Sequence, residues 1–382
     1  MIDPIQYLQK LNDSGVNFFA GVPDSLLKQF CACVTDTMPE SAHVIAVNEG
    51  AAVAQGIGYH LGTGKLPLIY LQNSGLGNII NPLLSLASNE VYGTPMIVMI
   101  GWRGELGVKD EPQHVHQGRV MEDMLQAINI PYIILGQSDA EAYSGTQEAI
   151  ALAEKTDSPV VMLVRKGTFG EYKPKKPISQ LKMSREEAIA LACETLPAEA
   201  VVICTTGMPS RELFEHRAAK KEGHHRDFLT VGGMGHASQI ALSLASCRDD
   251  LSVFCFDGDG AALMHMGSLG SIGQSSRKNL THIIFNNGVH DSVGGQPTIG
   301  FGLSFTEIAL ACGYSSACKV DSRASLISAI GHANTHDGPH MIDVWVRPGN
   351  RADLGRPTST PAENKIDLMN HLKGEDFYVP TH

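Results

Sequence analysis

The chain has 382 residues, of which 43% are hydrophobic and 18% are charged, values typical of soluble globular proteins. No stretch approaches the roughly 18 consecutive apolar residues that a membrane-spanning helix needs, and a net charge of −11 argues against general nucleic-acid binding. The length favours two domains, and the eight cysteines show no CxxC pair, so we expect reduced thiols. Residues 1–4 lack the positive charge and apolar run of a secretory signal, and we expect a cytoplasmic protein.

The first half of the chain alternates short apolar runs with stretches of helical period. Short apolar runs bounded by Gly, Pro or polar clusters predict strands. These runs lie at residues 16–20, 43–47, 66–71, 96–100, 132–135 and 160–164. Stretches of helical period lie between them, for example at 24–34 and 50–61. This alternation predicts a doubly wound parallel sheet.

Polar and charged side chains follow the predicted strands of this first half. They are Asp24, Ser25, Glu49, Asn73, His114 and His116. All of them should lie at the edge formed by the carboxyl ends of the strands, where such sheets bind ligands. An acid in a first helical turn, such as Glu49, also complements the helix dipole in many proteins without a catalytic role. These residues alone therefore assign no function.

Residues 167–183 interrupt the alternation with a segment rich in proline and lysine, which we interpret as a linker. This divides the chain into domains at 1–166 and 184–382. A helix should begin near Ser184, because Ser-Arg-Glu-Glu resembles a capping box. The strand pattern then resumes at residues 200–204, 228–231, 252–256, 282–285 and 341–346. We therefore expect two α/β domains of similar architecture.

The predicted strand at 252–256 leads into Asp257-Gly258-Asp259-Gly260, and a helix should follow from Ala261. Glycines at such a turn let backbone amides approach a phosphate, and the helix N-terminus adds partial positive charge. A carboxylate would repel a phosphate unless a divalent cation lay between them. Asp259 is therefore interpreted as a Mg2+ ligand. A tight turn capped by this aspartate is the simpler alternative for Gly-Asp-Gly taken alone.

The next predicted strand ends in Asn286-Asn287, with 25 residues between Gly260 and Asn286. That spacing accommodates one helix and a crossover to a neighbouring parallel strand. A carboxylate and an amide oxygen would then meet at the same edge of the sheet. Both are oxygen donors suited to Mg2+.

The spaced pair of Gly-Asp-Gly and Asn-Asn resembles the diphosphate motif of the thiamine-diphosphate-dependent enzymes. The resemblance implies thiamine diphosphate and Mg2+ as cofactors, with the metal held by Asp259, Asn287 and the backbone carbonyl of Val289. It implies further cofactor contacts from Thr206, Gly207, Met234, Gly258, Gly260 and Ala261. In this family a bulky apolar side chain supports the thiazolium ring, and Met234, 25 residues before Asp259, suits that role.

The same resemblance assigns roles in the first half of the chain. It implies a pyrimidine-binding domain at 1–166, a diphosphate-binding domain at 184–382 and no middle domain. Glu49 stands where the family places the acid that hydrogen-bonds the aminopyrimidine ring. Asp24, His114 and His116 stand where related pyruvate enzymes place groups that handle protons. Val115 separates the two histidines, which are adjacent in those enzymes, so which histidine is catalytic stays open.

The overall resemblance runs nearly end to end and is greatest to the phosphonopyruvate decarboxylases, then to the sulfopyruvate decarboxylases. It is carried by residues 21–27, 110–118, 290–298 and 347–365. It implies non-oxidative decarboxylation of 3-phosphonopyruvate to phosphonoacetaldehyde and CO2. A phosphonate needs cations and hydrogen-bond donors. The candidates are Ser25, Asn73, Gln296, Thr298 and Arg351, with Arg347, Arg356, Lys109 and Arg119 as further cations.

Other readings remain open. A sulfonate resembles a phosphonate, so the sequence does not separate the two substrates. A thiamine-dependent carboligase or oxidoreductase would share the cofactor. A non-enzymatic binding module would be expected to lack Glu49, Asp259 or Asn287, and all three are present. The resemblance also implies a homodimer or higher homo-oligomer, because the family builds its site across a subunit interface. The expected partner is a small anionic 2-oxo acid, without nucleic acid or membrane.

Overall fold

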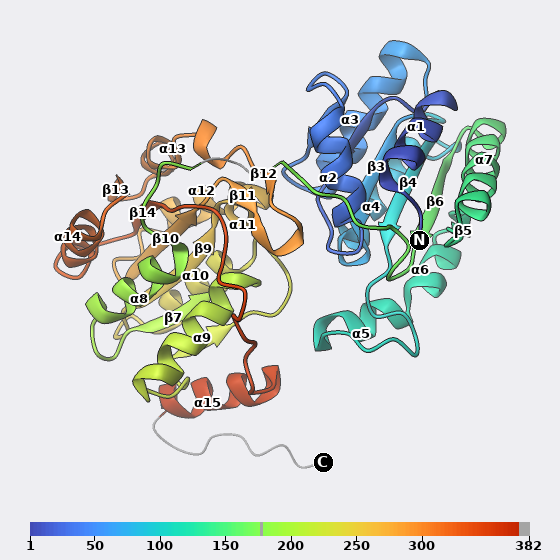
Figure 1. The fold of residues 1–382 in the computed structure, drawn as a ribbon. Coiled ribbons are helices and arrows are strands. Elements are labelled where there is room, and N and C mark those ends of the chain that lie inside the picture. Colours follow the sequence, from blue (N-terminus) through green and yellow to red (C-terminus); the bar gives the residue numbers. More distant parts are fainter. Residues whose placement is uncertain (176–178, 374–382) are drawn as a thin grey trace. The chain divides into compact units, whose positions relative to one another are not determined.

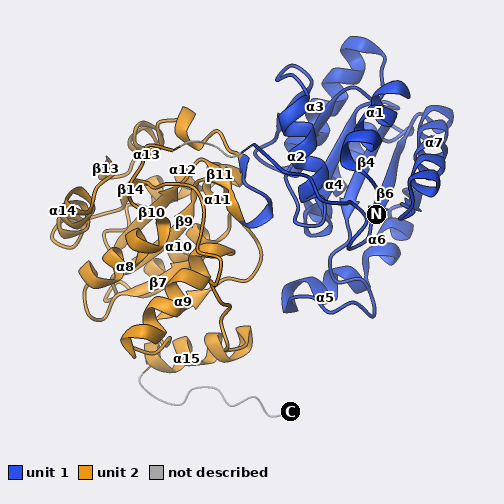
Figure 2. Cartoon of the chain, viewed as in Figure 1, with its two compact units in different colours: residues 1–176, 292–296 blue, residues 177–291, 297–382 orange. Residues whose placement is uncertain are grey.

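A computed structural model describes residues 1–175 and 179–373 of the chain. The chain divides into two compact units. Unit 1 comprises residues 1–176 and 292–296, and unit 2 comprises residues 177–291 and 297–382 (Figure 2). Residues 176–178 of the predicted linker and residues 374–382 of the predicted second domain lie outside the described part. The domain boundaries at 1–166, 167–183 and 184–382 stay a prediction.

Unit 1 is built on a sheet of six parallel strands (Figure 1). The strands are β1 (Phe19–Gly21), β2 (His43–Ile45), β3 (Leu68–Gln72), β4 (Met96–Gly101), β5 (Tyr132–Ile134) and β6 (Pro159–Val164). The helices are α1 (Pro4–Asp13), α2 (Lys28–Thr37), α3 (Glu49–Thr63), η1 (Asn73–Gly75), α4 (Leu76–Pro82), η2 (Leu83–Ala87), α5 (Pro112–Arg119), α6 (Met121–Ala127) and α7 (Asp139–Thr156).

Both faces of the unit 1 sheet are covered. In β4, Ile97 and Met99 join one cluster of buried apolar residues, whereas Val98 and Ile100 join a second cluster. Successive side chains of a strand point to opposite faces, so the two clusters lie on the two sides of the sheet. Burial on both faces explains why these strands appear in the sequence as continuous apolar runs.

Unit 2 contains a second six-stranded parallel sheet. Its strands are β7 (Val201–Cys204), β8 (Asp227–Leu229), β9 (Val253–Gly258), β10 (Leu280–Asn286), β13 (Ser316–Val320) and β14 (His340–Trp345), and a separate small sheet pairs β11 (Val289–His290) with β12 (Gln296–Pro297). Its helices are α8 (Arg185–Thr195), α9 (Met208–Lys220), α10 (Ala237–Cys247), α11 (Asp259–Met264), α12 (Gly267–Ser275), η4 (Gly300–Gly302), α13 (Phe305–Cys312), α14 (Arg323–Ala333) and α15 (Pro361–Lys373). The short elements η3 (Asp291–Val293) and β12 each include residues of both units.

The two large sheets have the same strand order. It is β2-β1-β3-β4-β6-β5 in unit 1 and, read from the other edge, β8-β7-β9-β10-β14-β13 in unit 2. Counted from the first strand of each sheet, both orders are therefore 2-1-3-4-6-5. In each sheet, loops that follow neighbouring strands meet at the carboxyl edge, which is the edge that positions the candidate site.

The predicted fold class, two doubly wound parallel-sheet domains, is confirmed. Each of the eleven predicted strands overlaps an observed one, and the predicted capping box at Ser184 is present, with its side chain accepting from the backbone N–H of Glu187. The sequence reading missed β13, an edge strand whose residues are mostly half-exposed. All eight cysteines are free, and only Cys247 is exposed. Among the described residues, no helix has the length and apolarity needed to cross a bilayer.

Candidate active site

Asp24 follows β1 and is completely buried. Its Oδ2 accepts hydrogen bonds from the backbone N–H groups of Leu26 (2.7 Å) and Leu27 (3.2 Å). Its Oδ1 has no hydrogen-bond partner within the described chain. Burial raises the pKa of Asp24 to about 6, although the backbone hydrogen bonds and Arg103 oppose the rise. The carboxyl group can therefore exchange a proton close to neutral pH, which is the property expected of a group that handles protons in catalysis.

Glu49 is the first residue of α3 and is 5% exposed. The helix begins here because the Asn48 side chain accepts a hydrogen bond from the backbone N–H of Ala51 at 2.8 Å. The Glu49 Oε2 accepts a hydrogen bond from Asn78 Nδ2 at 2.7 Å. Burial raises the pKa of Glu49 and the Asn78 hydrogen bond lowers it in part. Gly75 lies so close that a Cβ at this position would collide with the Glu49 carboxylate.

Arg103 connects two of the predicted substrate residues, and sequence reasoning did not single it out. Its NH1 donates to Ser25 Oγ at 2.6 Å. Asn73 Nδ2 donates to the backbone carbonyl of Arg103 at 2.7 Å, and the Arg103 N–H donates to Asn73 Oδ1 at 3.2 Å. Asp110 receives hydrogen bonds from both Nε and NH2 of the guanidinium. Burial alone would raise the pKa of Asp110, but Arg103 and backbone N–H groups hold it well below its usual range.

The two predicted histidines lie in α5 but have different surroundings. His114 is 8% exposed, and its Nδ1 has no hydrogen-bond partner in the described chain. Burial, aided by the positive charge of Arg103, lowers the pKa of His114 to about 4. His116 is exposed, and Arg119 lies 2.9 Å from its Nδ1. Positions two residues apart on a helix do not share a face, which explains why only His114 is buried.

Asp259 begins α11 at the end of β9 and is 2% exposed. Thr298 Oγ1 donates a short hydrogen bond to Asp259 Oδ2, and the Gly300 N–H donates to Thr298 Oγ1 at 3.1 Å. Burial raises the pKa of Asp259 to about 6, and hydrogen bonds from Thr298 and backbone N–H groups, including that of Asn287, oppose the rise. In the described chain no basic side chain forms an ion pair with Asp259. A bound cation would compensate this buried charge.

Asn287 follows β10, which lies beside β9 with Phe285 opposite Gly258. The hydrogen bond from the Asn287 backbone N–H lowers the pKa of Asp259 and so opposes the effect of burial. The Asn287 Oδ1 accepts from the Val289 N–H at 3.1 Å, and its Nδ2 donates to Asp291 Oδ2 at 2.7 Å. Asp259 and Asn287 are therefore at neighbouring strand ends, as the sequence predicts. Metal coordination by these residues and by the Val289 carbonyl stays a prediction.

The other predicted cofactor residues also follow strands of the unit 2 sheet. Thr206 and Gly207 come after β7, and Gly207 has the positive φ of 94° at the start of α9. Met234 lies in the loop between β8 and α10 and is half-buried. Gly258, Gly260 and Ala261 belong to the turn from β9 into α11. Because β8, β7, β9 and β10 are neighbours in the sheet, these loops share one edge.

Three predicted substrate residues have varied surroundings. The Gln296 side chain is buried, and neither of its polar atoms has a hydrogen-bond partner within the described chain. Thr298 donates to Asp259, as noted above. Arg351 is ion-paired with Glu186, Glu215 and Asp353, and about a third of its side chain is exposed. Their contact with substrate stays a prediction, and the charge of Arg351 is already balanced by carboxylates.

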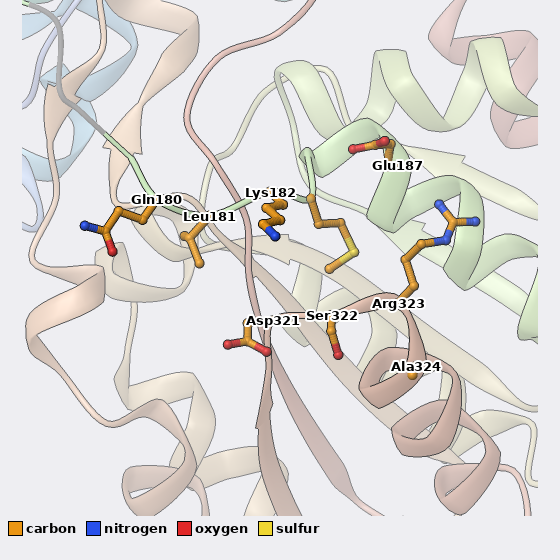
Figure 3. A pocket seen from close by; sticks show the side chains of 9 residues that line it. Gln180, Leu181, Lys182, Glu187, Asp321, Ser322, Arg323 and Ala324 are labelled. Atoms are coloured by element: carbon orange, nitrogen blue, oxygen red, sulfur yellow. The ribbon is translucent and has the colours of Figure 1, made fainter.

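Two other features of unit 2 stand apart from these residues. A cavity of about 610 Å3 lies between the segment before α8 and the start of α14, and Lys182, Asp321 and Arg323 are among its lining residues (Figure 3). No predicted site residue lines it. Cys255, Asp257 and His282 form a buried group. His282 Nε2 lies 3.3 Å from Asp257 Oδ2 and its Nδ1 lies 3.3 Å from Tyr314 Oη, while burial raises the pKa of the Cys255 thiol.

Comparison with known families identifies the class. Residues 6–127 match the N-terminal TPP binding domain of thiamine pyrophosphate enzymes, and residues 205–344 match the C-terminal TPP binding domain. The two matches fall on the two sheets described above. Unit 1 and unit 2 thus correspond to the paired domains that bind thiamine pyrophosphate, which is also called thiamine diphosphate.

The chain belongs to the thiamine-diphosphate-dependent decarboxylase family. It is 33% identical to phosphonopyruvate decarboxylase from Streptomyces viridochromogenes over 95% of this chain and 93% of the relative. Phosphonopyruvate decarboxylase from Streptomyces hygroscopicus is 34% identical over 95% of this chain and 92% of its own length. Sulfopyruvate decarboxylase from Methanosarcina acetivorans is 28% identical over 94% of this chain and 95% of its own length. These matches confirm the family resemblance predicted from the sequence.

Proposed function

We propose that the protein catalyses the thiamine-diphosphate- and Mg2+-dependent, non-oxidative decarboxylation of 3-phosphonopyruvate to phosphonoacetaldehyde and CO2. The observation that carries the proposal is the pairing of a buried Asp259 with Asn287 at adjacent strand ends. The similarity to the two Streptomyces phosphonopyruvate decarboxylases over nearly their full length favours the phosphonate substrate.

The donor set fits Mg2+. Asp259 supplies a buried carboxylate without a cationic partner in the described chain, and Asn287 supplies an amide oxygen. The Val289 carbonyl would be the third protein ligand. Mg2+ prefers oxygen donors and commonly bridges phosphate groups. The metal would therefore anchor the diphosphate beside the turn at residues 258–260, where backbone N–H groups can approach a phosphate.

Bound thiamine diphosphate supplies the electron sink that stabilises the charge left when CO2 departs. The Glu49 carboxyl would hold the aminopyrimidine ring by a hydrogen bond to a ring nitrogen. A carboxyl group with a raised pKa is suited to that task, because it can share a proton with a weakly basic nitrogen. Asn78, which donates to Glu49 Oε2, would keep the other oxygen directed at the ring.

Proton handling on the substrate would fall to Asp24 and His114. Asp24 Oδ1 is the unpartnered oxygen of a carboxyl whose pKa is about 6, so it can carry a proton at neutral pH in part of the molecules. His114 is neutral at that pH because its pKa is lowered to about 4, and one ring nitrogen then donates while the other accepts. Such a pair could deliver the proton that completes the aldehyde product.

The substrate phosphonate carries a charge near −2 and needs donors in a fixed arrangement. Arg103 is bonded to both predicted substrate residues of unit 1, to Ser25 through NH1 and to Asn73 through its backbone carbonyl, while Asp110 pairs with its Nε and NH2. Its proposed role is to position these two donors for the phosphonate. We therefore add Arg103 to the candidate residues of the substrate site. Gln296, whose buried amide has no partner within the described chain, would donate a further hydrogen bond.

We further propose a homodimer or higher homo-oligomer. Support comes from large apolar side chains that unit 1 leaves exposed along one stretch of chain. They are Leu84, Leu86, Val91 and Tyr92. A subunit interface would cover such side chains, if they form a contiguous surface. Size-exclusion chromatography with light scattering should show at least a dimer, and a fully active monomer would contradict it. A cytoplasmic location remains a prediction.

The decisive experiment compares substrates. Purified protein would be supplied with thiamine diphosphate and Mg2+ and offered 3-phosphonopyruvate, sulfopyruvate and pyruvate separately, with CO2 and aldehyde both measured. We expect the highest kcat/KM with phosphonopyruvate and no turnover after removal of the metal with a chelator. A preference for sulfopyruvate would replace the proposed substrate, and the Methanosarcina relative makes this the second candidate. Release of CO2 without a stoichiometric aldehyde would indicate a carboligase or oxidoreductase instead.

A further inference from the structure

A buried arginine of unit 2 is connected to the predicted metal ligand Asn287 through one carboxylate. Arg185 is the first residue of α8 and is 4% exposed. Its Nε and NH2 donate to the two carboxylate oxygens of Glu212 at 2.8 and 3.0 Å. Its NH1 donates to Asp291 Oδ2 at 2.8 Å. One guanidinium thus holds two carboxylates from different parts of the unit, the buried Glu212 and the half-buried Asp291.

Asp291 is the middle of this connection. Its Oδ2 accepts from Arg185 NH1 and also from Asn287 Nδ2, which lies 2.7 Å away. The backbone N–H of Gly349 donates to both Asp291 oxygens, at 3.0 and 3.2 Å. Three donors from three separate segments therefore fix the position of the Asp291 carboxylate.

The contact with Asp291 determines which way the Asn287 amide faces. A carboxylate only accepts hydrogen bonds, so it selects the NH2 end of the amide. At the other end, Oδ1 accepts from the Val289 N–H. A flipped amide would place an oxygen against the Asp291 carboxylate and an NH2 group against the Val289 N–H. The Asn287 oxygen, which has a second lone pair, is thereby held in one orientation.

Stability alone does not account for a buried arginine with two carboxylates. Replacing a buried ion-pair group by apolar residues is often neutral or stabilising, because removing charges from water is costly. The need to orient a metal ligand would explain why Arg185, Glu212 and Asp291 are charged. Residues that hydrogen-bond to metal ligands are known to change metal affinity. The group also carries a formal charge of −1, which complements a divalent cation nearby.

We propose that Arg185 is a positioning residue for the Mg2+ site, acting through Asp291 on Asn287. The inference rests on the proposed function, because it needs a divalent cation at Asp259 and Asn287. Glu212 fixes the position of the Arg185 guanidinium. The guanidinium in turn fixes Asp291, whose carboxylate orients the Asn287 amide. Loss of the arginine should therefore weaken metal binding without removing any metal ligand.

The matched control is Arg217, which lies in the same unit and has a similar environment. It is 3% exposed, it donates to both oxygens of the buried Asp227 at 3.1 and 3.2 Å, and it also donates to Glu222 at 2.6 Å. No bond connects it to the predicted metal ligands among the described contacts. Arg185→Lys and Arg217→Lys each break a bidentate pair while keeping the charge.

The test is direct titration of Mn2+, an EPR-active substitute for Mg2+, into protein saturated with thiamine diphosphate. We expect Arg185→Lys to weaken Mn2+ binding by about 10-fold or more, in the range typical of partners behind metal ligands. Arg217→Lys should stay within about 2-fold of the unmodified protein. Thermal unfolding should show a similar loss of stability for both variants.

Three outcomes would overturn the proposal or its basis. Unchanged Mn2+ affinity in Arg185→Lys would remove the positioning role, and an equal loss in Arg217→Lys would reduce the effect to general destabilisation. If Arg185→Lys does not fold, Asp291→Ala tests the same connection, because it removes the oxygen that accepts from both Arg185 and Asn287, and unchanged Mn2+ affinity there would again overturn it. Failure of the unmodified protein to bind Mn2+ at all would count against the proposed function itself, separately from the role of Arg185.

Discussion

The two units share one strand order but carry different chemistry at equivalent strand ends. After the first four strands, unit 1 has Asp24, Glu49, Asn73 and Arg103, and unit 2 has Thr206, Met234, Asp259 and Asn287. The acid that follows the second strand of unit 1 has a methionine as its counterpart. The comparison shows that a common topology fixes where functional residues can lie, whereas the residues themselves decide what each half does.

The hydrogen bonds of the predicted site residues also differ between the two units. In unit 1, Asp24 and Glu49 are buried carboxyl groups with raised pKa values and few hydrogen-bond partners. In unit 2, Asp259 accepts from Thr298, and Asn287 is held at both ends of its amide. Burial also raises the pKa of Asp259 to about 6, as it does for Asp24, so the raised pKa is common to both units and the difference lies in the fixed Asn287 amide. We therefore propose that unit 1 serves proton exchange and that unit 2 fixes ligand geometry. Substitutions in unit 1 should change turnover, while those in unit 2 should change metal affinity.

Glu49→Gln provides the strongest test of this difference. Glutamine keeps the size of the side chain and can still accept from Asn78, but it cannot share a proton with the coenzyme ring. We expect kcat to fall by at least about 100-fold. Circular dichroism and Mn2+ affinity should remain unchanged. Full activity in this variant would contradict the proposed role of Glu49. A loss of metal affinity as large as the loss of turnover would contradict the proposed separation of functions between the two units.

Asp24→Asn should reveal the energetic cost of a buried carboxylate. Its folded pKa of about 6 lies above the ordinary 3.8, so the folded state binds the proton more tightly than the unfolded state. Stability from this group is present below about pH 4 and is lost as the pH rises to about 6. At pH 8 the variant should be more stable by on the order of 2 to 3 kcal/mol.

Urea unfolding at several pH values from 5 to 8 would measure this effect. The gain in the free energy of unfolding should shrink towards pH 5, because the native carboxyl group is then increasingly protonated. Asp249→Asn, at an exposed aspartate, provides the control and should show little change at any pH. A gain for Asp24→Asn that is the same at pH 5 and pH 8 would show that the ionised carboxyl is not its source.

The two histidines of α5 give the smallest and most discriminating comparison. His114→Gln should lower kcat by about 10-fold or more, since a buried ring with an unpartnered nitrogen would be lost from the proton path. His116→Gln should change kcat by less than about 2-fold, because this ring is exposed. Steady-state rates over a range of pH would settle which histidine acts. The opposite ranking would move the proton donor to His116.

Much of the fold could be predicted because strands buried on both faces appear as apolar runs. Ser316–Val320 was missed because this edge strand is mostly half-exposed and includes Ser316 and Lys319 among its five residues. The strand predicted at 16–20 is observed at Phe19–Gly21, so its position was correct within three residues. Period and composition therefore locate buried strands well, and they locate exposed edges and strand ends poorly.

The site was predictable only where local sequence carries a recurrent spacing. Asp259 and Asn287 belong to such a pattern, and the structure brings their strand ends together. Arg103 has no pattern around it, and its importance becomes visible only through its hydrogen bonds. Arg185 lies 27 residues from Glu212 and 106 from Asp291. Ion pairs between residues so far apart in sequence form only in the completed fold. No local sequence pattern predicts them.

The close contact between Gly75 and Glu49 has a consequence for how this protein tolerates variation. Gly75 contributes no functional group, yet any Cβ at this position would overlap the Glu49 carboxylate. A missense change to alanine or serine would force the Glu49 carboxylate out of its present position. In a saturation library selected for function, codon 75 should therefore be as depleted of alternatives as codon 49.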